Sequence, residues 1–253
     1  MTLYLTLASC AFLAGWLVYR YDMYEREPWY MVLLAVALGA LAMWGIGFIE
    51  EATLRLIVER PTPAAMAFVA STHEEGVRLV LVLAIALLIP GQFNDPMDGI
   101  IYGSLVGLGM AIIESVDYLN RARPPETLPP TEVIRLLGHL IMGGITGFAA
   151  GMFRMRMPRW FPALVGCVAF STMLHFLWDV IALESRRLPV VPGWMRAAGV
   201  VLMLGGMAFF GFLVVLASEW SRLVFAPHAA HRLWGWPFTL LMKRPHGGGP
   251  PGD

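Results

Sequence analysis

The sequence predicts an all-α membrane protein, a polytopic transmembrane bundle of about seven to eight helices. Of its 253 residues, 58% are hydrophobic and only 14% are charged, whereas soluble domains carry about 25% charged residues. About seven apolar runs of roughly 20 residues follow one another, and each is long enough to cross a bilayer. The 18 basic and 18 acidic residues cancel, which leaves no positive field to bind a nucleic acid. A soluble enzyme, a disordered protein and a nucleic-acid partner are therefore excluded.

The apolar runs place the spans, in order, at residues 3–19, 29–49, 64–89, 99–119, 133–153, 160–183 and 197–217. The first run has no basic region before it and no small-residue cleavage site before Arg20, so it is interpreted as a span and not as a signal peptide. The connectors are short and rich in Pro, Arg and Asp, as interfacial loops are. We expect one integral-membrane domain over residues 1–244 and a disordered Gly/Pro-rich tail over residues 245–253.

Ionisable residues interrupt four of these spans. A charged side chain in the middle of a bilayer costs at least about 2.5–3.5 kcal/mol, so each such residue needs a compensating role. These residues are Glu74, Glu75 and Arg78 in the third span, Glu114 in the fourth, His139 in the fifth, and His175 and Asp179 in the sixth.

The depths of these residues agree across helices that run in opposite directions. Side A is defined as the side of the N-terminus. With a rise of 1.5 Å per residue, Glu75 and Glu114 each lie roughly 21–22 Å from side B. His139 lies roughly 9 Å from side A, and His175 roughly 22 Å from side B. All four fall at one level of a hydrocarbon core about 30 Å thick. The sequence therefore predicts one polar cluster in a water-accessible cavity in the leaflet of side A.

Helical phase supports this cluster. Glu74 shares a helix face with Arg78, and His175 shares one with Asp179, because four residues make about one turn. Gly103 and Gly107 lie on nearly the same face as Glu114, and His139 leads a stripe formed by Gly143, Gly147 and Gly151. Small residues at this spacing let membrane helices approach closely. The polar groups thus lie on faces that pack inward.

Several chemistries use such a set. A carboxylate and a histidine can activate water for hydrolysis, and the same groups can bind zinc, although no His-Glu-x-x-His motif is present. Acid–histidine relays also occur in proton-coupled transporters. A buried ion pair that only joins helices is the structural alternative.

Four stretches resemble the PrsW family of intramembrane proteases, within the superfamily of CAAX-processing membrane proteases. They are the acidic loop at residues 21–28, which ends in Glu27-Pro28; Glu74-Glu75-Gly-Val-Arg78; residues 98–115, a Gly-rich segment that includes Glu114; and His139 together with His175-Phe-Leu-Trp-Asp179. The family commonly has Lys at the position of Arg78, and usually Phe and Asn at those of Met110 and Ser115.

The resemblance implies peptide-bond hydrolysis in or at the edge of the bilayer, with Glu74 as the base and Glu75 and Arg78 orienting it. His139 and Glu114 would complete the water site, while His175 and Asp179 would polarise the scissile carbonyl. We expect no cofactor, with glutamate-activated water favoured over a zinc-dependent mechanism. A non-catalytic scaffold is an alternative, because the γ-secretase scaffold subunit is a distant relative that has lost protease function. The presence of both Glu74 and Glu75 favours an enzyme.

The resemblance also implies the partners and the location. The substrate would be a membrane-anchored protein, such as a single-span anti-sigma factor cut near its outer face, and the surroundings a lipid bilayer. The protein would be a multi-pass protein of a bacterial cytoplasmic (inner) membrane. The basic residues of the loops slightly favour side B as the cytoplasmic side, so the cavity would open outward.

Overall fold

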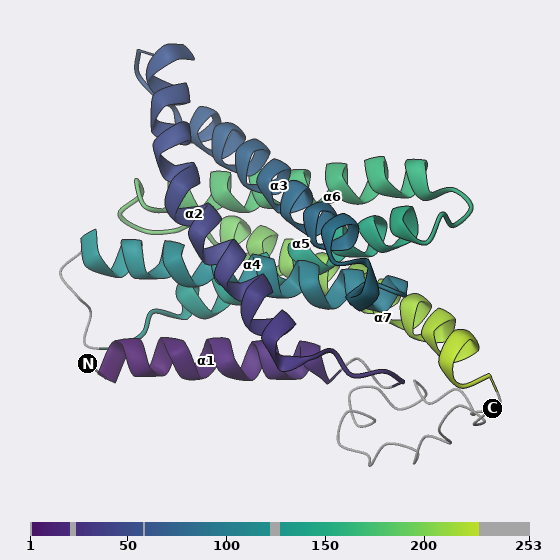
Figure 1. The fold of residues 1–253 in the computed structure, drawn as a ribbon. Helices are drawn as coiled ribbons and strands as arrows, with labels where there is room; N and C mark the ends of the chain where they lie inside the picture. The colour runs from purple at the N-terminus through teal and green to yellow at the C-terminus, as the bar shows by residue number, and fades with distance from the viewer. Residues whose placement is uncertain (1, 21–23, 58, 122–126, 228–253) are drawn as a thin grey trace.

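The computed structural model is a bundle of seven α-helices (Figure 1) and describes residues 2–20, 24–57, 59–121 and 127–227. No strand occurs in these ranges, so the all-α prediction is confirmed. The tail predicted at residues 245–253 lies outside them. The helices are α1 (Thr2–Tyr19), α2 (Trp29–Ile57), α3 (Pro63–Leu88), α4 (Pro96–Arg121), α5 (Pro130–Arg154), α6 (Trp160–Ser185) and α7 (Gly193–Phe225), with a short 3-10 helix, η1 (Pro90–Gln92), before α4.

Helices α2 and α7 extend furthest beyond the apolar runs that predicted them. Helix α2 continues beyond residue 49 to Ile57, and α7 begins before residue 197 and ends at Phe225. Hydropathy marks only the apolar part of a helix, whereas charged residues continue α2 and interact one turn apart, as Glu51 and Arg55 do. Six of the described helices are long and apolar enough to cross a membrane. Helix α3 is not among them, since it carries the charged residues of the predicted cluster in its middle.

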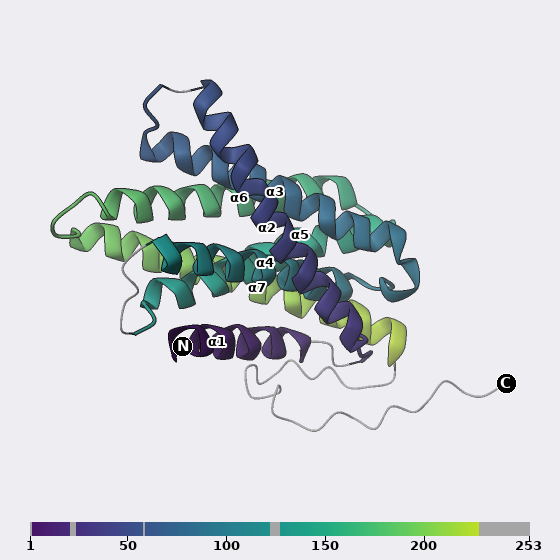
Figure 2. The ribbon, with the colours of Figure 1, turned by 60° about the vertical axis from the view of Figure 1, so that its left-hand side comes forward.

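Helices α4 and α5 form the centre of the bundle. They are the most buried of the six apolar helices and pack against each other, while α2 crosses α4 obliquely (Figures 1 and 2). Helix α3 lies between α2 and α6, and α7 packs on α5. The side chains that α4 and α5 turn toward each other are therefore held by neighbours on several sides.

Glycine permits the close approach of α4 and α5. A Cβ atom added to Gly103 would meet the backbone of Gly143, and one added to Gly107 would meet the carbonyl group of His139. The glycine stripes of the sequence thus form the contact itself, in the way small residues do in membrane helix pairs. Because α4 and α5 touch along these stripes, Glu114 and His139, each beyond the glycines of its own helix, come together.

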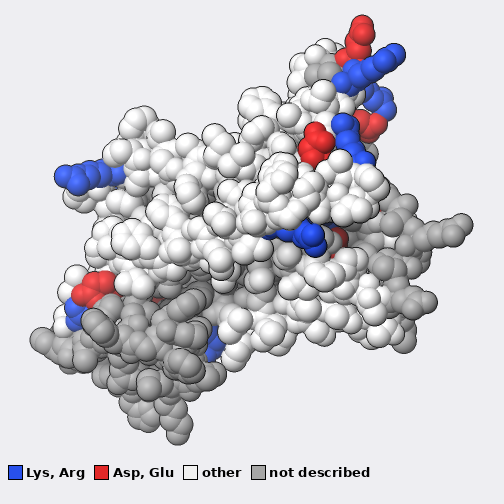
Figure 3. All heavy atoms as spheres, turned by 180° about the vertical axis from the view of Figure 1, so that it is seen from behind, with Lys and Arg blue, Asp and Glu red and all other residues white. Residues whose placement is uncertain are grey.

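The outer surface is apolar over most of the bundle. Large exposed side chains include Phe12, Leu41, Trp44, Phe161 and Leu204. Figure 3 shows one face on which uncharged residues dominate and charged side chains gather mainly toward the edges, with a small group in the middle. An apolar exterior of this kind suits contact with lipid chains.

The acidic loop between α1 and α2 is attached to the start of α4, far from the predicted cluster. The hydroxyl group of Tyr102 donates a hydrogen bond to the Glu27 carboxylate, and the hydroxyl of Tyr19 donates one to the Glu27 carbonyl at 3.1 Å. Burial raises the pKa of Glu27 above its usual range. Tyr102 is 12 residues before Glu114, roughly 18 Å along the helix. This loop therefore holds helices together at the other end of α4.

We expect Gly143→Ala to destabilise the bundle by about 1–3 kcal/mol, a usual cost of overpacking. The added methyl group would lie inside van der Waals contact with the backbone of Gly103. Gly166→Ala on α6 is the matched control, because nothing lies within 4 Å of its Cβ position. Thermal unfolding in detergent, followed by tryptophan fluorescence, compares the two. Equal melting temperatures would contradict a tight α4–α5 contact.

Candidate active site

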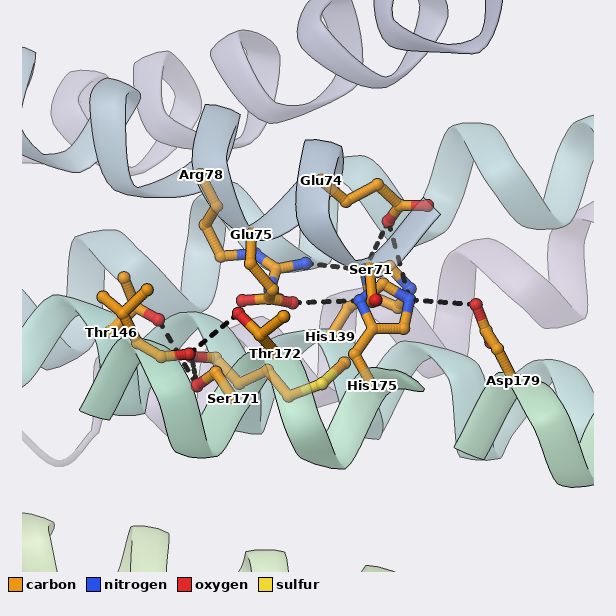
Figure 4. Close-up of polar contacts among 12 residues, drawn as sticks. Ser71, Glu74, Glu75, Arg78, His139, Thr146, Ser171, Thr172, His175 and Asp179 are labelled. Atoms are coloured by element: carbon orange, nitrogen blue, oxygen red, sulfur yellow. Dashed lines mark hydrogen bonds and ion pairs between the residues drawn. The ribbon is translucent and has the colours of Figure 1, made fainter. Parts of the chain in front are cut away.

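The structure brings all seven sequence-predicted residues into one cluster. Helix α3 supplies Glu74, Glu75 and Arg78, α4 supplies Glu114, α5 supplies His139, and α6 supplies His175 and Asp179. Six of them are joined in Figure 4 by the contacts drawn there, and Glu114 joins through His139. The two histidines and the three α3 residues are almost completely buried, at 0–4% exposure. The predicted single polar cluster is therefore present.

Glu74 faces both histidines. Its Oε2 atom lies 3.8 Å from Nδ1 of His139 and 3.9 Å from Nε2 of His175. The two imidazole rings are themselves 5.1 Å apart between centroids. The same Oε2 atom is buried and has no hydrogen-bond partner among the described residues. One carboxylate oxygen and two ring nitrogens thus surround a single point.

Each histidine is held at its other nitrogen by a carboxylate. Nε2 of His139 lies 3.1 Å from Glu114, whose other oxygen lies 3.2 Å from Nε of Arg135. Nδ1 of His175 lies 3.0 Å from Glu75. A carboxylate that accepts from one ring nitrogen fixes the tautomer and the orientation of the ring. The nitrogens nearest Glu74 are therefore aimed by contacts on the opposite side of each ring.

Arg78 connects the two halves of this network. It is fully buried, forms a short ion pair with Glu75, and places its second terminal nitrogen 2.9 Å from Nδ1 of His139. A guanidinium group only donates, so Nδ1 of His139 must accept. Glu75 and Arg78 thus contact the two histidines, whereas the family resemblance implied that they orient Glu74.

Helix α6 is held against α5 by hydroxyl groups next to the cluster. Thr146 donates to Ser171 at 3.3 Å, and Ser171 donates to the Met142 carbonyl at 3.2 Å. Ser171 lies one turn before His175, on the same helix face. These bonds fix the register of the two helices, so that His175 faces His139 (Figure 4).

A cavity of about 760 Å³ lies beside the cluster and is lined by residues of α2 to α7. Glu74, Glu114, His139, His175 and Asp179 all contribute to its wall. The remaining lining includes apolar side chains, among them those of Trp44, Phe48, Leu174, Trp178 and Met203. A large, mostly apolar pocket with a few convergent polar groups is the usual form of a binding site.

Five charged residues that line this cavity were not predicted from the sequence, namely Glu50, Glu51, Asp117, Arg135 and Arg186. Arg135 precedes His139 by one turn, so a search for charges on the His139 face could have found it. Glu50 was placed outside the second span because the apolar run ended at residue 49. Arg135 and Arg186 both lie over the ring of Tyr118, at 4.1 and 4.4 Å from its centroid. These contacts join α4 and α5 to the end of α6 at the cavity.

Comparison with known proteins gives one family. A sequence model described as the PrsW family intramembrane metalloprotease matches residues 27–218. Curated relatives named Protease PrsW come from Geobacillus kaustophilus (28% identical, 67% of this chain and 74% of that protein), Shouchella clausii (31%, 65% and 75%) and Bacillus subtilis (29%, 64% and 74%). No solved structure matches.

The expectation of an enzyme without a cofactor is wrong. The matched family is described as a metalloprotease, which implies a metal ion. The sequence shows no local metal-binding motif, because the candidate ligands Glu74, His139 and His175 come from three different helices. Atoms of these three side chains that could bind a metal all lie within 4.8 Å of one another.

These side chains fit a zinc ion chemically. Zinc in proteins takes nitrogen and carboxylate oxygen ligands at about 2.0–2.2 Å, which puts tetrahedral ligands roughly 3.3 Å apart. The distances of 3.8 and 3.9 Å from Glu74 to the two rings are about half an ångström longer than that. Nδ1 of His139 already accepts from Arg78, so a metal at that nitrogen would replace this hydrogen bond.

We expect Arg78→Met to lower the free energy of unfolding by about 3–5 kcal/mol, because it leaves the buried Glu75 carboxylate without its guanidinium partner. Adding Glu75→Gln should restore part of this loss by removing the charge. Arg55→Met is the matched control, since its ion pair with Glu51 is exposed and contributes under about 1 kcal/mol. Unfolding in detergent measures all three, and equal losses for Arg78→Met and Arg55→Met would contradict the buried pair.

Proposed function

We propose, because this chain belongs to the PrsW family of intramembrane metalloproteases, that it cleaves membrane-anchored proteins in the cavity beside Glu74, with Glu74, His139 and His175 holding a metal ion. As a member of this family, the chain is an intramembrane peptidase. The observation that carries the proposal is the buried Glu74 oxygen that faces two histidine nitrogens on a cavity wall.

The metal assignment is supported by the contacts around the three residues. Metal-binding histidines usually donate their other ring nitrogen to a carboxylate or a carbonyl group. Glu114 lies in that position for His139, and Glu75 for His175. Arg135 and Arg78 in turn pair with these carboxylates. When bound, zinc would supply Lewis acidity and lower the pKa of a coordinated water molecule.

Two further polar side chains of the cavity wall, Asp179 and Arg135, can take part in hydrolysis because they line the same cavity. Asp179 lies 3.4 Å from Nε2 of His175 and is a quarter exposed to the cavity. It can accept a proton or hydrogen bond from a water molecule or from a substrate amide. Arg135 carries a permanent positive charge and lines the same cavity. It can stabilise negative charge that develops on a carbonyl oxygen during hydrolysis.

The proposed substrate is a membrane-anchored protein, of which a single-span anti-sigma factor is the example implied by family resemblance. The cavity supports a hydrophobic substrate because Trp44, Phe48 and Trp178 line it together with the polar cluster. An apolar segment would lose little solvation on moving there from lipid. The cluster lies in the leaflet of side A by the depth estimate, so cleavage would occur near that surface.

We expect the purified protein to contain about one zinc ion per chain, and His175→Ala to lower zinc affinity about tenfold or more through loss of a ligand. His73→Ala is the matched control. His73 lies one residue before Glu74 but bonds to the Val69 carbonyl and contacts Thr53. Mass spectrometry of the metal in washed samples measures occupancy. Equal zinc content in both variants, or none in the unaltered protein, would count against the metal assignment.

For the substrate, Glu74→Gln should abolish cleavage while the protein still accumulates in the membrane, because this substitution removes the carboxylate that faces both histidines. Cleavage is measured by sequencing the new N-termini that appear in membranes digested by the unaltered protein. Membranes treated with the Glu74→Gln variant serve as the blank. The expected cuts fall in or next to the membrane segment of single-span proteins. Cuts confined to soluble proteins, or full activity in Glu74→Gln, would contradict the proposal.

A further inference from the structure

Glu50 is a half-buried carboxylate of the cavity wall that the proposed function does not use. It lies on α2, and its Oε1 atom is buried without a hydrogen-bond partner in the described part of the chain. Its neighbour Glu51 leaves the helix about 100° further round and pairs with Arg55 on the exposed side. Both acids line the cavity, but Glu51 has an arginine partner, whereas Oε1 of Glu50 has no hydrogen-bond partner among the described residues.

Glu50 lines the same cavity as the cluster. Its carboxylate interacts electrostatically with Glu114, His175 and Asp179, and that of Glu74 interacts with Glu50. Helix α2 packs against α3 and α4, which carry Glu74 and Glu114. Glu50 thus lies on the α2 wall of the same space that the cluster lines.

Most other carboxylates around this space already have fixed partners. Glu114 lies against Arg135 and His139, and Glu75 against Arg78 and His175. Asp179 lies 3.4 Å from His175. Asp117 has an interaction of its own, and Glu74 faces the two histidines. Glu50 is the lining carboxylate in the described ranges whose partner is not supplied by the protein.

An unpartnered carboxylate inside a membrane protein is costly and is usually functional. The cost falls when something that enters the cavity donates a hydrogen bond or a proton to it. In peptide hydrolysis two such donors are present, the attacking water molecule and the amide nitrogen of the substrate. The cavity beside the cluster, which Glu50 and Glu74 both line, is the space that would hold them.

On the basis of the proposed function, we propose that Glu50 is a catalytic carboxylate that transfers the proton in peptide-bond cleavage. The Glu50 carboxylate takes one proton from the attacking water molecule, whose oxygen forms the new bond to the carbonyl carbon. The resulting carboxylic acid gives this proton to the leaving nitrogen as the carbon–nitrogen bond breaks. The new terminal carboxylic acid then ionises, and no oxidant, reductant or further reactant is consumed.

The test compares Glu50→Gln, Glu50→Asp and the control Glu51→Gln. The probe is an internally quenched peptide that carries a cleavage site identified in digested membranes. We expect Glu50→Gln to lower kcat about 10²–10⁴-fold, as loss of a proton-transfer group does, with KM within about twofold. Glu50→Asp should recover part of the rate, because it keeps the carboxylate on a shorter side chain, and Glu51→Gln should match the unaltered protein.

Zinc content and melting temperature of the variants separate this role from a structural one. Both should be unchanged in Glu50→Gln, since Glu50 is neither among the three proposed ligands nor hydrogen-bonded through Oε1. Unaltered kcat in Glu50→Gln would overturn this inference and leave the proposed function standing. A rise in KM alone, or loss of zinc with the rate, would also overturn it. An unaltered protein that cleaves no membrane protein would overturn the proposed function first.

Discussion

The buried ion pair between Glu75 and Arg78 is the interaction on which the cluster depends. Both side chains are inaccessible to solvent, and neither charge could remain there without the other. Each paired group also contacts a histidine: Oε1 of Glu75, which pairs with Arg78, lies 3.0 Å from Nδ1 of His175, and the second terminal nitrogen of Arg78 lies 2.9 Å from Nδ1 of His139. One ion pair on α3 thereby fixes imidazoles from α5 and α6. A substitution that removes either partner affects both helices as well as its own.

The second constraint is the distance between α4 and α5. Glu114 reaches His139 only because glycines let the two backbones touch. In lipid, helices gain little from hydrophobic burial, so close packing and polar contacts must supply the attraction. The glycine contact and the Glu114–His139–Arg135 contacts occupy successive segments of the same interface. Packing and chemistry are therefore coupled, and a methyl group added at Gly143 would move polar groups that it never touches.

The sequence predicted the fold class and the convergence of seven residues for a simple physical reason. A charge inside an apolar span stands out, and the constant helical rise converts its position into a depth. The same reasoning missed Glu50, because the apolar run that predicted the second span ended at residue 49, whereas helix α2 continues to Ile57. It also failed on the metal, since Glu74, His139 and His175 are brought together by tertiary packing and share no local spacing. The contact of Arg78 with His139 joins two helices. It depends on how far each side chain extends between them, which the spacing of residues along the sequence does not give.

The balance of charge around the cavity favours a cation at its centre. Among the cavity lining and the adjacent Glu75–Arg78 pair, seven carboxylates outnumber three arginines: Glu50, Glu51, Glu74, Glu75, Glu114, Asp117 and Asp179 against Arg78, Arg135 and Arg186. The two histidines carry charge only when protonated. Carboxylates that crowd together in a medium of low dielectric constant repel strongly, so the excess must be neutralised by protons or by an ion. Protonated carboxylates, however, could not act as the bases that hydrolysis needs. A divalent cation held by Glu74 and the two histidines, as proposed above, would neutralise part of the same excess and would leave Glu50 and Asp179 able to accept protons.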